Sequence, residues 1–218
     1  DASLAIRAAE GQETRSILGY DYYVDNRDDP IDPKKGWDLL FGQDFSGLGG
    51  TVKYVSTSIL VHGYYPVAEN FVFTQRLDAG IIKGIGQDVR LNDRFFKGGS
   101  DFRGFKSGGM GPRDLITDDA VGSEAYAFAT SEMSFPNGLP EALGVGTSWF
   151  VDYGFAGKVS HKPLGTNIQD KFAPRVSTGL SVNWKSPFGP VRLDFSKVIL
   201  DESYDQRELF RFSAGTTF

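Results

Sequence analysis

The chain has 218 residues, with 27 glycines, 14% aromatic residues, no cysteine and a formal net charge of −5. The absence of cysteine excludes a disulfide scaffold and a thiolate metal site, and the charge gives no sign of a basic face for nucleic acid. No segment approaches the ~18 continuous apolar residues that a transmembrane helix needs. No linker or repeat period divides the chain, so we expect one domain.

Segments with period-two alternation or dense β-formers recur along the chain, and no stretch has a convincing helical period. In chain order we expect strands at residues 3–9, 15–25, 37–45, 52–66, 70–83, 124–135, 144–155, 175–185, 191–200 and 208–218. Most of these segments are long enough to cross a bilayer as tilted strands, whereas strands of soluble proteins are usually around five to six residues. The sequence therefore predicts an all-β, antiparallel fold.

The clearest strands carry an apolar face opposite a polar one. In the last segment Phe210 and Phe212 alternate with Arg211 and Ser213. Such alternation fits a transmembrane β-barrel, with lipid outside and water inside. The alternative is a soluble barrel or sandwich, in which the apolar face would be the core. Strand length, aromatic placement and the aromatic C-terminal residue favour the membrane barrel.

The connections between the expected strands differ in length. Short turns lie at 66–69, 136–140 and 186–190, and longer connections lie at 26–35, 84–123 and 158–174. Outer-membrane barrels have short turns on one side of the membrane and long extracellular loops on the other. We therefore expect the three longer connections at one end of the barrel, with a long extracellular loop at about 84–123.

Residues 95–114 hold six glycines and a proline, a composition that disfavours regular helix or strand. Four aromatic residues in the same stretch argue against disorder. Loops of this length in a compact protein are usually functional when they are ordered. Arg103 stands in its middle, between two phenylalanines.

Two carboxylates are candidate partners of Arg103. If Trp149 and Tyr153 face lipid, Asp152 faces the lumen, and a similar argument places Glu132 inward on the preceding strand. An arginine fork can bind carboxylates in a bidentate fashion. The alternative is that all three side chains are separately solvated in a wet lumen.

Several motifs together resemble the BamA-type family of outer-membrane protein assembly factors. Residues 102–105 (FRGF) resemble the [VI]RG[FY] motif of the sixth extracellular loop, with Phe102 in place of the aliphatic residue. Residues 149–154 (WFVDYG) resemble the inward F-x-D-x-G strand, and 184–191 (WKSPFGPV) resemble the W-x-S-P-x-G-P turn. The C-terminal FRFSAGTTF resembles the β-signal. Their order along the chain makes the resemblance specific.

The resemblance implies a barrel of about sixteen strands, of which residues 1–218 would supply about ten C-terminal ones, without the POTRA domains. It implies assembly and insertion of β-barrel proteins in the bacterial cell outer membrane. The implied partners are outer-membrane lipids, unfolded barrel clients and accessory assembly lipoproteins. It implies no enzyme activity, cofactor or metal. The alternative within the same superfamily is a polypeptide translocation pore.

The resemblance also assigns roles to individual residues. One set forms a lock that holds the loop in the lumen: Arg103, Gly104, Phe105, Glu132 and Asp152. The other set belongs to the β-signal and the seam strand, whose edge would template client strands: Phe210, Phe212, Gly215 and Phe218.

Overall fold

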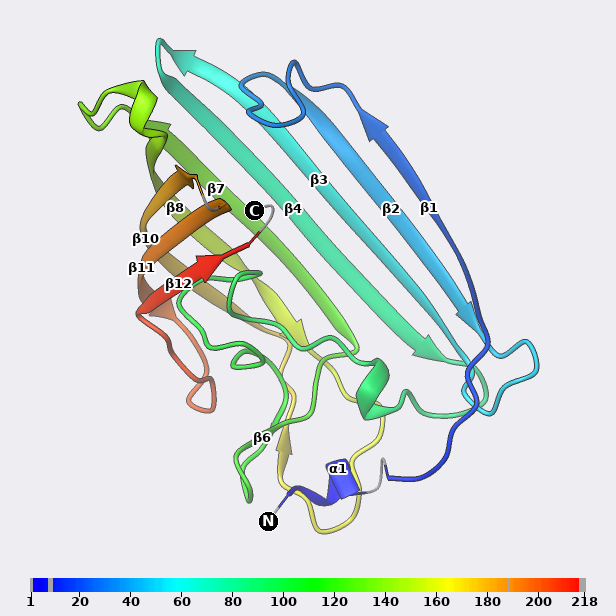
Figure 1. Ribbon diagram of the computed structural model, residues 1–218. Helices are drawn as coiled ribbons and strands as arrows, with labels where there is room; N and C mark the ends of the chain where they lie inside the picture. Colours follow the sequence, from blue (N-terminus) through cyan, green and yellow to red (C-terminus); the bar gives the residue numbers. More distant parts are fainter. Residues whose placement is uncertain (1, 8–9, 188, 216–218) are drawn as a thin grey trace.

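The computed structural model describes residues 2–7, 10–187 and 189–215 (Figure 1). Nine strands form one antiparallel sheet in the order β1-β2-β3-β4-β7-β8-β10-β11-β12. They are β1 (Ile17–Asp25), β2 (Gly36–Ser46), β3 (Tyr54–Ala68), β4 (Phe71–Gly84), β7 (Ala125–Phe135), β8 (Val145–Gly157), β10 (Ala173–Ser186), β11 (Gly189–Leu200) and β12 (Phe210–Ala214). The sheet curves into an open trough (Figure 1), which confirms the all-β antiparallel prediction.

The prediction fails at the two ends of the chain. Of the strand expected at residues 3–9, residues 8 and 9 lie outside the described residues, and residues 3–7 are not a strand. They contain a short helix, α1 (Leu4–Arg7), whose Ala5 packs against Val121, Val159 and Ile168. Tertiary packing onto the loops has overridden a local β pattern that was too short to be decisive. The last strand begins at Phe210 rather than at 208.

The grouping of the long connections was also wrong in one case. Residues 26–35 join β1 to β2 at the end of the sheet that carries the short turns. There Asp32 lies 3.4 Å from the ammonium nitrogen of Lys185, which is near the β10–β11 turn. The other end carries the connections 47–53, 85–124, 158–172 and 201–209. Antiparallel order, not loop length, decides the end at which each connection lies.

Short elements tie the long loops together at that end. A three-stranded sheet joins β5 (Arg113–Asp114), β6 (Asp119–Ala120) and β9 (Ile168–Gln169). The described residues also form two 3-10 turns: η1 (Leu91–Asp93) at this end, and η2 (Glu141–Leu143) between β7 and β8 at the other end. Among the described residues, no helix is long and apolar enough to cross a membrane.

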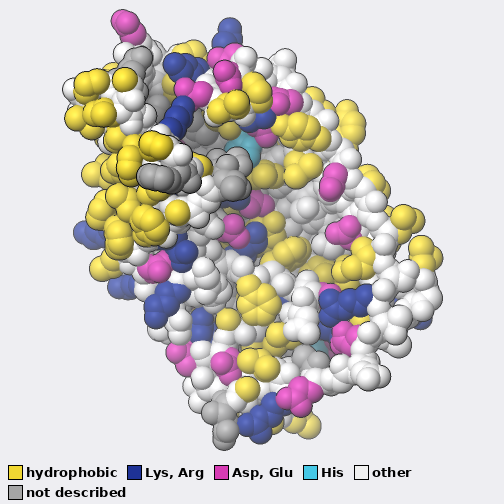
Figure 2. Space-filling view, viewed as in Figure 1, with side chains coloured by type: hydrophobic (Ala, Val, Ile, Leu, Met, Phe, Trp, Pro, Cys, Tyr) yellow, Lys and Arg dark blue, Asp and Glu magenta, His cyan; other side chains and the backbone are white. Residues whose placement is uncertain are grey.

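The two faces of the sheet differ in chemistry. On β8 the side chains of Trp149 and Tyr153 are 50% and 42% exposed on the convex face, whereas Phe150 and Asp152 on the concave face are buried. Figure 2 shows side chains of both charges inside the trough, and hydrophobic side chains gathered over β8 to β12. An apolar convex face and a polar concave face are what a membrane barrel presents to lipid and to its lumen.

Residues 85–124, which we call the RGF loop, fold back into the trough (Figure 1). Phe102 and Phe105 lie in a cluster with Met110, Tyr126 and Phe128, and all five are buried. Tyr126 and Phe128 point inward on β7 like Glu132, where the RGF loop covers them. This apolar cluster fixes the loop beside the polar wall that carries Asp152.

Candidate functional site

Arg103 forms a two-pronged contact with Asp152. Its Nε donates to Asp152 Oδ2 at 2.8 Å and its Nη2 donates to Oδ1 at 2.7 Å. Its backbone N–H also donates to Oδ2, at 3.0 Å. The two residues are only 6% and 1% exposed, so these charge-assisted bonds form away from bulk water. The planar guanidinium matches the carboxylate in a way that a lysine could not.

A second carboxylate completes the contacts of the guanidinium. Arg103 Nη1 donates to Glu132 Oε2 at 2.7 Å and to Ser181 Oγ at 3.2 Å. The guanidinium carbon lies 3.5 Å from the ring centre of Phe150. Burial alone lowers the pKa of Arg103, but the bonds and charges of Asp152 and Glu132 outweigh it and raise the pKa above its ordinary value. Arg103 is therefore a permanent cation held by two anions.

Hydroxyl groups add further hydrogen bonds to both acids. Thr130 Oγ1 donates to Asp152 Oδ1 at 2.8 Å, and Ser148 Oγ donates to Glu132 Oε1 at 2.6 Å. A buried charge is tolerated only when it is paired and hydrogen-bonded, and this group meets that condition. We call Arg103, Glu132 and Asp152 the arginine lock.

The backbone conformation at Gly104 allows this close approach. Gly104 has φ +92°, and a Cβ atom there would lie 3.0 Å from the Cβ of Ser177 and 3.1 Å from a methyl group of Val198. The Oγ of Ser177 donates to the carbonyl of Arg103 at 2.5 Å. The next residue, Phe105, is fully buried, with its ring edge-on to Phe102 at 5.5 Å. Arg103, Gly104 and Phe105 thus each contact the inner wall in a different way.

The charged network extends to a residue that the sequence argument did not assign. Arg192 on β11 donates from Nη2 to Glu132 Oε2 at 3.3 Å and from Nε to Asp194 Oδ1 at 2.9 Å. Glu132 is therefore shared between two arginines. The alternation of β11 placed Arg192 on the polar face, but it gave no indication of its partner on a distant strand.

These groups line a cavity in the trough of about 420 Å³. Its wall carries Arg103, Glu132, Asp152, Arg192 and Asp194, together with Arg76 and His62 on the neighbouring strands. With Asp101, the lining holds three arginines and four carboxylates, so the cavity is polar but nearly balanced in charge. The arrangement suits structural pairing inside a wet lumen.

The residues of the predicted seam strand lie apart from the lock. Phe210 and Phe212 are 51% and 59% exposed on the convex face of β12. The N–H of Gly215 donates to Pro190 O at 3.2 Å, across the end of β11. Phe218 lies outside the described residues. In the described part of the chain, β12 pairs with β11 alone and leaves its other edge open.

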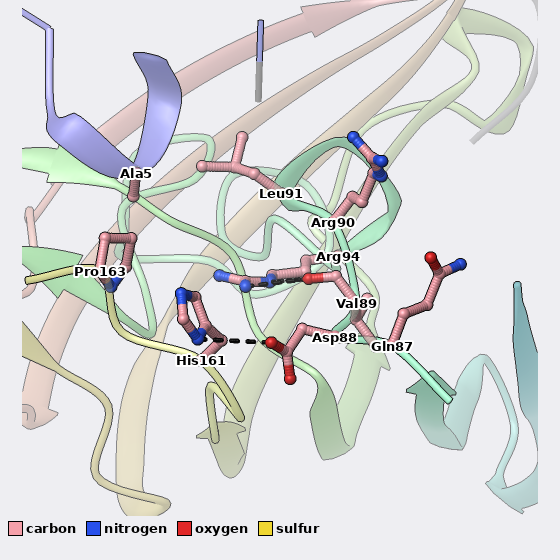
Figure 3. A pocket seen from close by; sticks show the side chains of 9 residues that line it. All are labelled: Ala5, Gln87, Asp88, Val89, Arg90, Leu91, Arg94, His161 and Pro163. Carbon is pink, nitrogen blue, oxygen red and sulfur yellow. Dashed lines mark hydrogen bonds and ion pairs between the residues drawn. The ribbon is translucent and has the colours of Figure 1, made fainter. Parts of the chain in front are cut away.

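A second hollow lies at the loop end of the molecule, between α1, the RGF loop and the 158–172 connection (Figure 3). There His161 Nδ1 is 3.3 Å from Asp88 Oδ2, and both side chains are more than half exposed. Arg94 points into the same hollow but donates to the carbonyl of Val89. The described residues contain no group of three or more potential metal ligands, here or elsewhere.

A model of the Omp85 superfamily domain matches residues 2–218. The chain belongs to the Omp85 superfamily. This Omp85 chain is 30% identical to the outer membrane protein assembly factor BamA of Neorickettsia risticii, over all of the chain and 29% of the relative. It is 29% identical to BamA of Nitratidesulfovibrio vulgaris, over all of the chain and 27% of that protein. The chain spans less than a third of the length of these relatives.

This Omp85 chain is also similar to a yeast protein and to a solved bacterial structure. It is 29% identical to the sorting assembly machinery 50 kDa subunit of Saccharomyces cerevisiae, over 95% of the chain and 44% of that protein. The crystal structure of BamA from Haemophilus ducreyi lacking POTRA domains 1–3 has a TM-score of 0.80 at 22% identity, over 93% of this chain and 42% of that one. The fold is therefore that of the BamA barrel, of which this chain covers a part.

Proposed function

We propose that this chain is the C-terminal barrel portion of an assembly factor that folds and inserts β-barrel proteins into the bacterial outer membrane. The observation that carries the proposal is the buried contact of Arg103 with Asp152 and Glu132, in a chain whose relatives are named as assembly factors. The lock fixes the RGF loop against the inner wall, close to the strands that lead to β12. No bond of a substrate is made or broken, so the protein is proposed to act without catalytic chemistry.

β12 is the proposed seam strand. An unpaired strand edge presents a row of N–H and C=O groups that can pair with an incoming strand. The pairing of β12 with β11 extends only from Phe210 to Ala214, so the seam strand is short. Its exposed Phe210 and Phe212 face lipid, which is where a client strand would enter the bilayer. Unfolded barrel clients, outer-membrane lipids and accessory lipoproteins are the proposed partners.

The lock is proposed to hold β12, through the RGF loop, in the position at which its open edge can pair with a client strand. A hydrogen bond to a charged group contributes ~1.5–3 kcal/mol, and the lock contains several of them in a buried setting. The RGF loop therefore cannot leave the trough without exposing Asp152 and Glu132 together. The relatives named above are assembly factors, so the alternative of a translocation pore is not carried further.

A crosslinking scan tests the seam. A photo-reactive residue is placed at each position of β12 in the intact membrane-embedded protein, and client capture is measured during assembly. We expect capture at positions along β12 and none at matched outward positions of β3, which is paired on both sides. A scan of β12 that captures no client, or captures no more than β3, would contradict the proposed function.

A further inference from the structure

A second buried arginine lies outside the lock. Arg175, near the start of β10, donates from Nε to Asp205 Oδ2 at 2.9 Å and from Nη2 to Oδ1 at 3.2 Å. Neither side chain has any exposed area. Asp205 belongs to residues 201–209, which connect β11 to β12 and which we call the β11–β12 segment. A bidentate, fully buried ion pair is a costly feature to place in a surface connection, and it calls for an explanation.

The wall of the sheet holds Arg175 in place. Its Nη1 donates to the carbonyls of Ala156 at 3.0 Å and Ala173 at 2.9 Å, at the ends of β8 and β10. Its Nη2 also contacts the hydroxyl of Tyr204 at 3.3 Å. The bonds to two strands fix the position of the guanidinium, so it offers Asp205 a binding partner of defined geometry.

Asp205 joins three parts of the molecule. Besides Arg175, its Oδ2 accepts the N–H of Glu202 at 2.8 Å, within its own segment. Its Oδ1 accepts the N–H of Gly111 at 3.3 Å, in the RGF loop. One carboxylate therefore connects the sheet, the β11–β12 segment and the RGF loop. We call Arg175 and Asp205 the latch.

Directly after the latch, the β11–β12 segment pairs with the loop stretch that carries the arginine lock. The N–H of Lys106 donates to Gln206 O at 2.9 Å, and the N–H of Glu208 donates to Gly104 O at 2.9 Å. Phe105 and Arg207 are partners in an antiparallel bridge between these two bonds. The N–H of Gln206 donates to Gly109 O at 2.8 Å. This is strand-like pairing with the loop.

The pairing of β12 with β11 ends close to where this pairing with the loop begins. β11 continues to Leu200, but its pairing with β12 ends at Phe195 and Phe210, followed by one bond from Ser196 N–H to Leu209 O at 2.8 Å. Residues 206–208 would have to align with the far half of β11 for β12 to be longer. The bonds to the RGF loop use backbone groups of Gln206 and Glu208, which lie on the opposite edge of the segment from the Leu209 carbonyl that faces β11. The loop therefore holds the segment by the edge that points away from β11, and the sheet pairing of β12 begins at Phe210, directly after the part that the loop holds.

We propose that Arg175 and Asp205 are positioning residues that hold the β11–β12 segment on the RGF loop and so set where the seam strand begins. The inference rests on the proposed function only in treating β12 as the seam. Without the latch, residues 206–208 are released from the loop, and β12 loses its defined start. Client insertion then falls because the edge offered to the client is no longer fixed.

Hydrogen–deuterium exchange on the intact membrane-embedded protein tests the latch without any client. The variant is Asp205→Asn, which keeps the shape of the side chain and removes its charge. We expect amides of Lys106, Gln206 and Glu208 to exchange at least about tenfold faster, while amides of β2 and β3 stay within about twofold of wild type. Client insertion by the same variant should fall in parallel.

The matched control is Asp201→Asn. Asp201 forms a bidentate pair with Arg207 in the same segment, at 2.7 and 2.9 Å, but Arg207 is 59% exposed and the pair lies wholly within the segment. We expect its exchange pattern and client insertion to match wild type. An Asp205→Asn variant that does not speed exchange of the three amides would overturn the proposal. So would one that also speeds exchange throughout β2 and β3, because Asp205 would then serve general stability.

If Asp205→Asn does not fold, Arg175→Lys replaces it, since lysine keeps the charge and loses the fork. The same amides should exchange faster, and failure of both variants to fold would overturn a positioning role in favour of a folding role. If Asp205→Asn shows the expected change in exchange but the wild-type protein inserts no client, the proposed function is refuted and the latch is not. The two failures are therefore distinguishable.

Discussion

In the described part of the chain, two buried arginine–aspartate pairs are bidentate, and they differ in which of the two partners lies on the sheet. In the lock the arginine is on the loop and the aspartate is on the sheet, whereas in the latch the arginine is on the sheet and the aspartate is on the connecting segment. The lock also has Glu132 as a second anion, whereas in the described part of the chain Asp205 is the one carboxylate paired with Arg175. A buried charge with a second partner can survive the loss of the first, and one with a single partner cannot.

The largest effect should come from breaking the latch. Arg175→Met leaves Asp205 buried without a cation, and breaking a buried pair in this way costs about 4 kcal/mol. The free energy of local opening, measured from hydrogen exchange of the Lys106 amide that bonds Gln206, should fall by that amount. The double variant Arg175→Met/Asp205→Leu should recover most of the loss, because it removes both charges. Failure of the double variant to recover would mean that charge burial is not the cause.

The lock should be somewhat more tolerant. Arg103→Ala leaves Asp152 with the hydroxyl of Thr130 and leaves Glu132 with Arg192, so we expect a loss of about 3 kcal/mol in the same assay. Client insertion should fall with it. Arg103→Lys is the control: it keeps the charge, loses the fork, and should restore only part of both. Wild-type stability and insertion in Arg103→Ala would remove the lock from the mechanism.

A milder change isolates the second anion. Glu132→Gln keeps the Asp152 fork and leaves Arg192 paired with Asp194, so the loss should be about 1.5 kcal/mol, the lower value for bonds to a charged group. Glu132→Gln, Arg103→Ala and the variant that carries both substitutions form a double-mutant cycle. Simple additivity of the two losses would show that Glu132 and Arg103 do not act as a unit.

The smallest effect should come from the exposed pair. Asp201→Asn breaks the bond to Arg207, whose side chain is 59% exposed although that of Asp201 is 15% exposed. Solvent reaches the pair through Arg207, and solvent-exposed pairs contribute less than about 1 kcal/mol. A salt titration checks the same point, since an exposed pair is screened and a buried one is not. A loss as large as that of Arg175→Met would show that burial does not explain the difference in strength between this pair and the latch.

The contrast between the forks also shows how far the sequence could be read. Period-two alternation placed Asp152 and Glu132 on the inner face, and the resemblance supplied the reason to pair them with Arg103. The latch was not predicted, because Asp205 lies in a connection without periodicity and thirty residues from Arg175. Alternation gives the face of a strand residue but not the path of a loop. The short helix α1 was missed for a related reason, since docking onto the loops decides its conformation.

The early end of the β11–β12 pairing has a geometric consequence for the barrel wall. A strand rises about 3.3 Å per residue, so the stretch of β11 from 197 to 200 forms a bare rim roughly 13 Å high at the loop end of the wall. The backbone of 206–208 bonds to the RGF loop by the edge that points away from this rim. The position of the loop therefore limits how close 206–208 can come to β11, and the height of the side opening follows from where the loop is held.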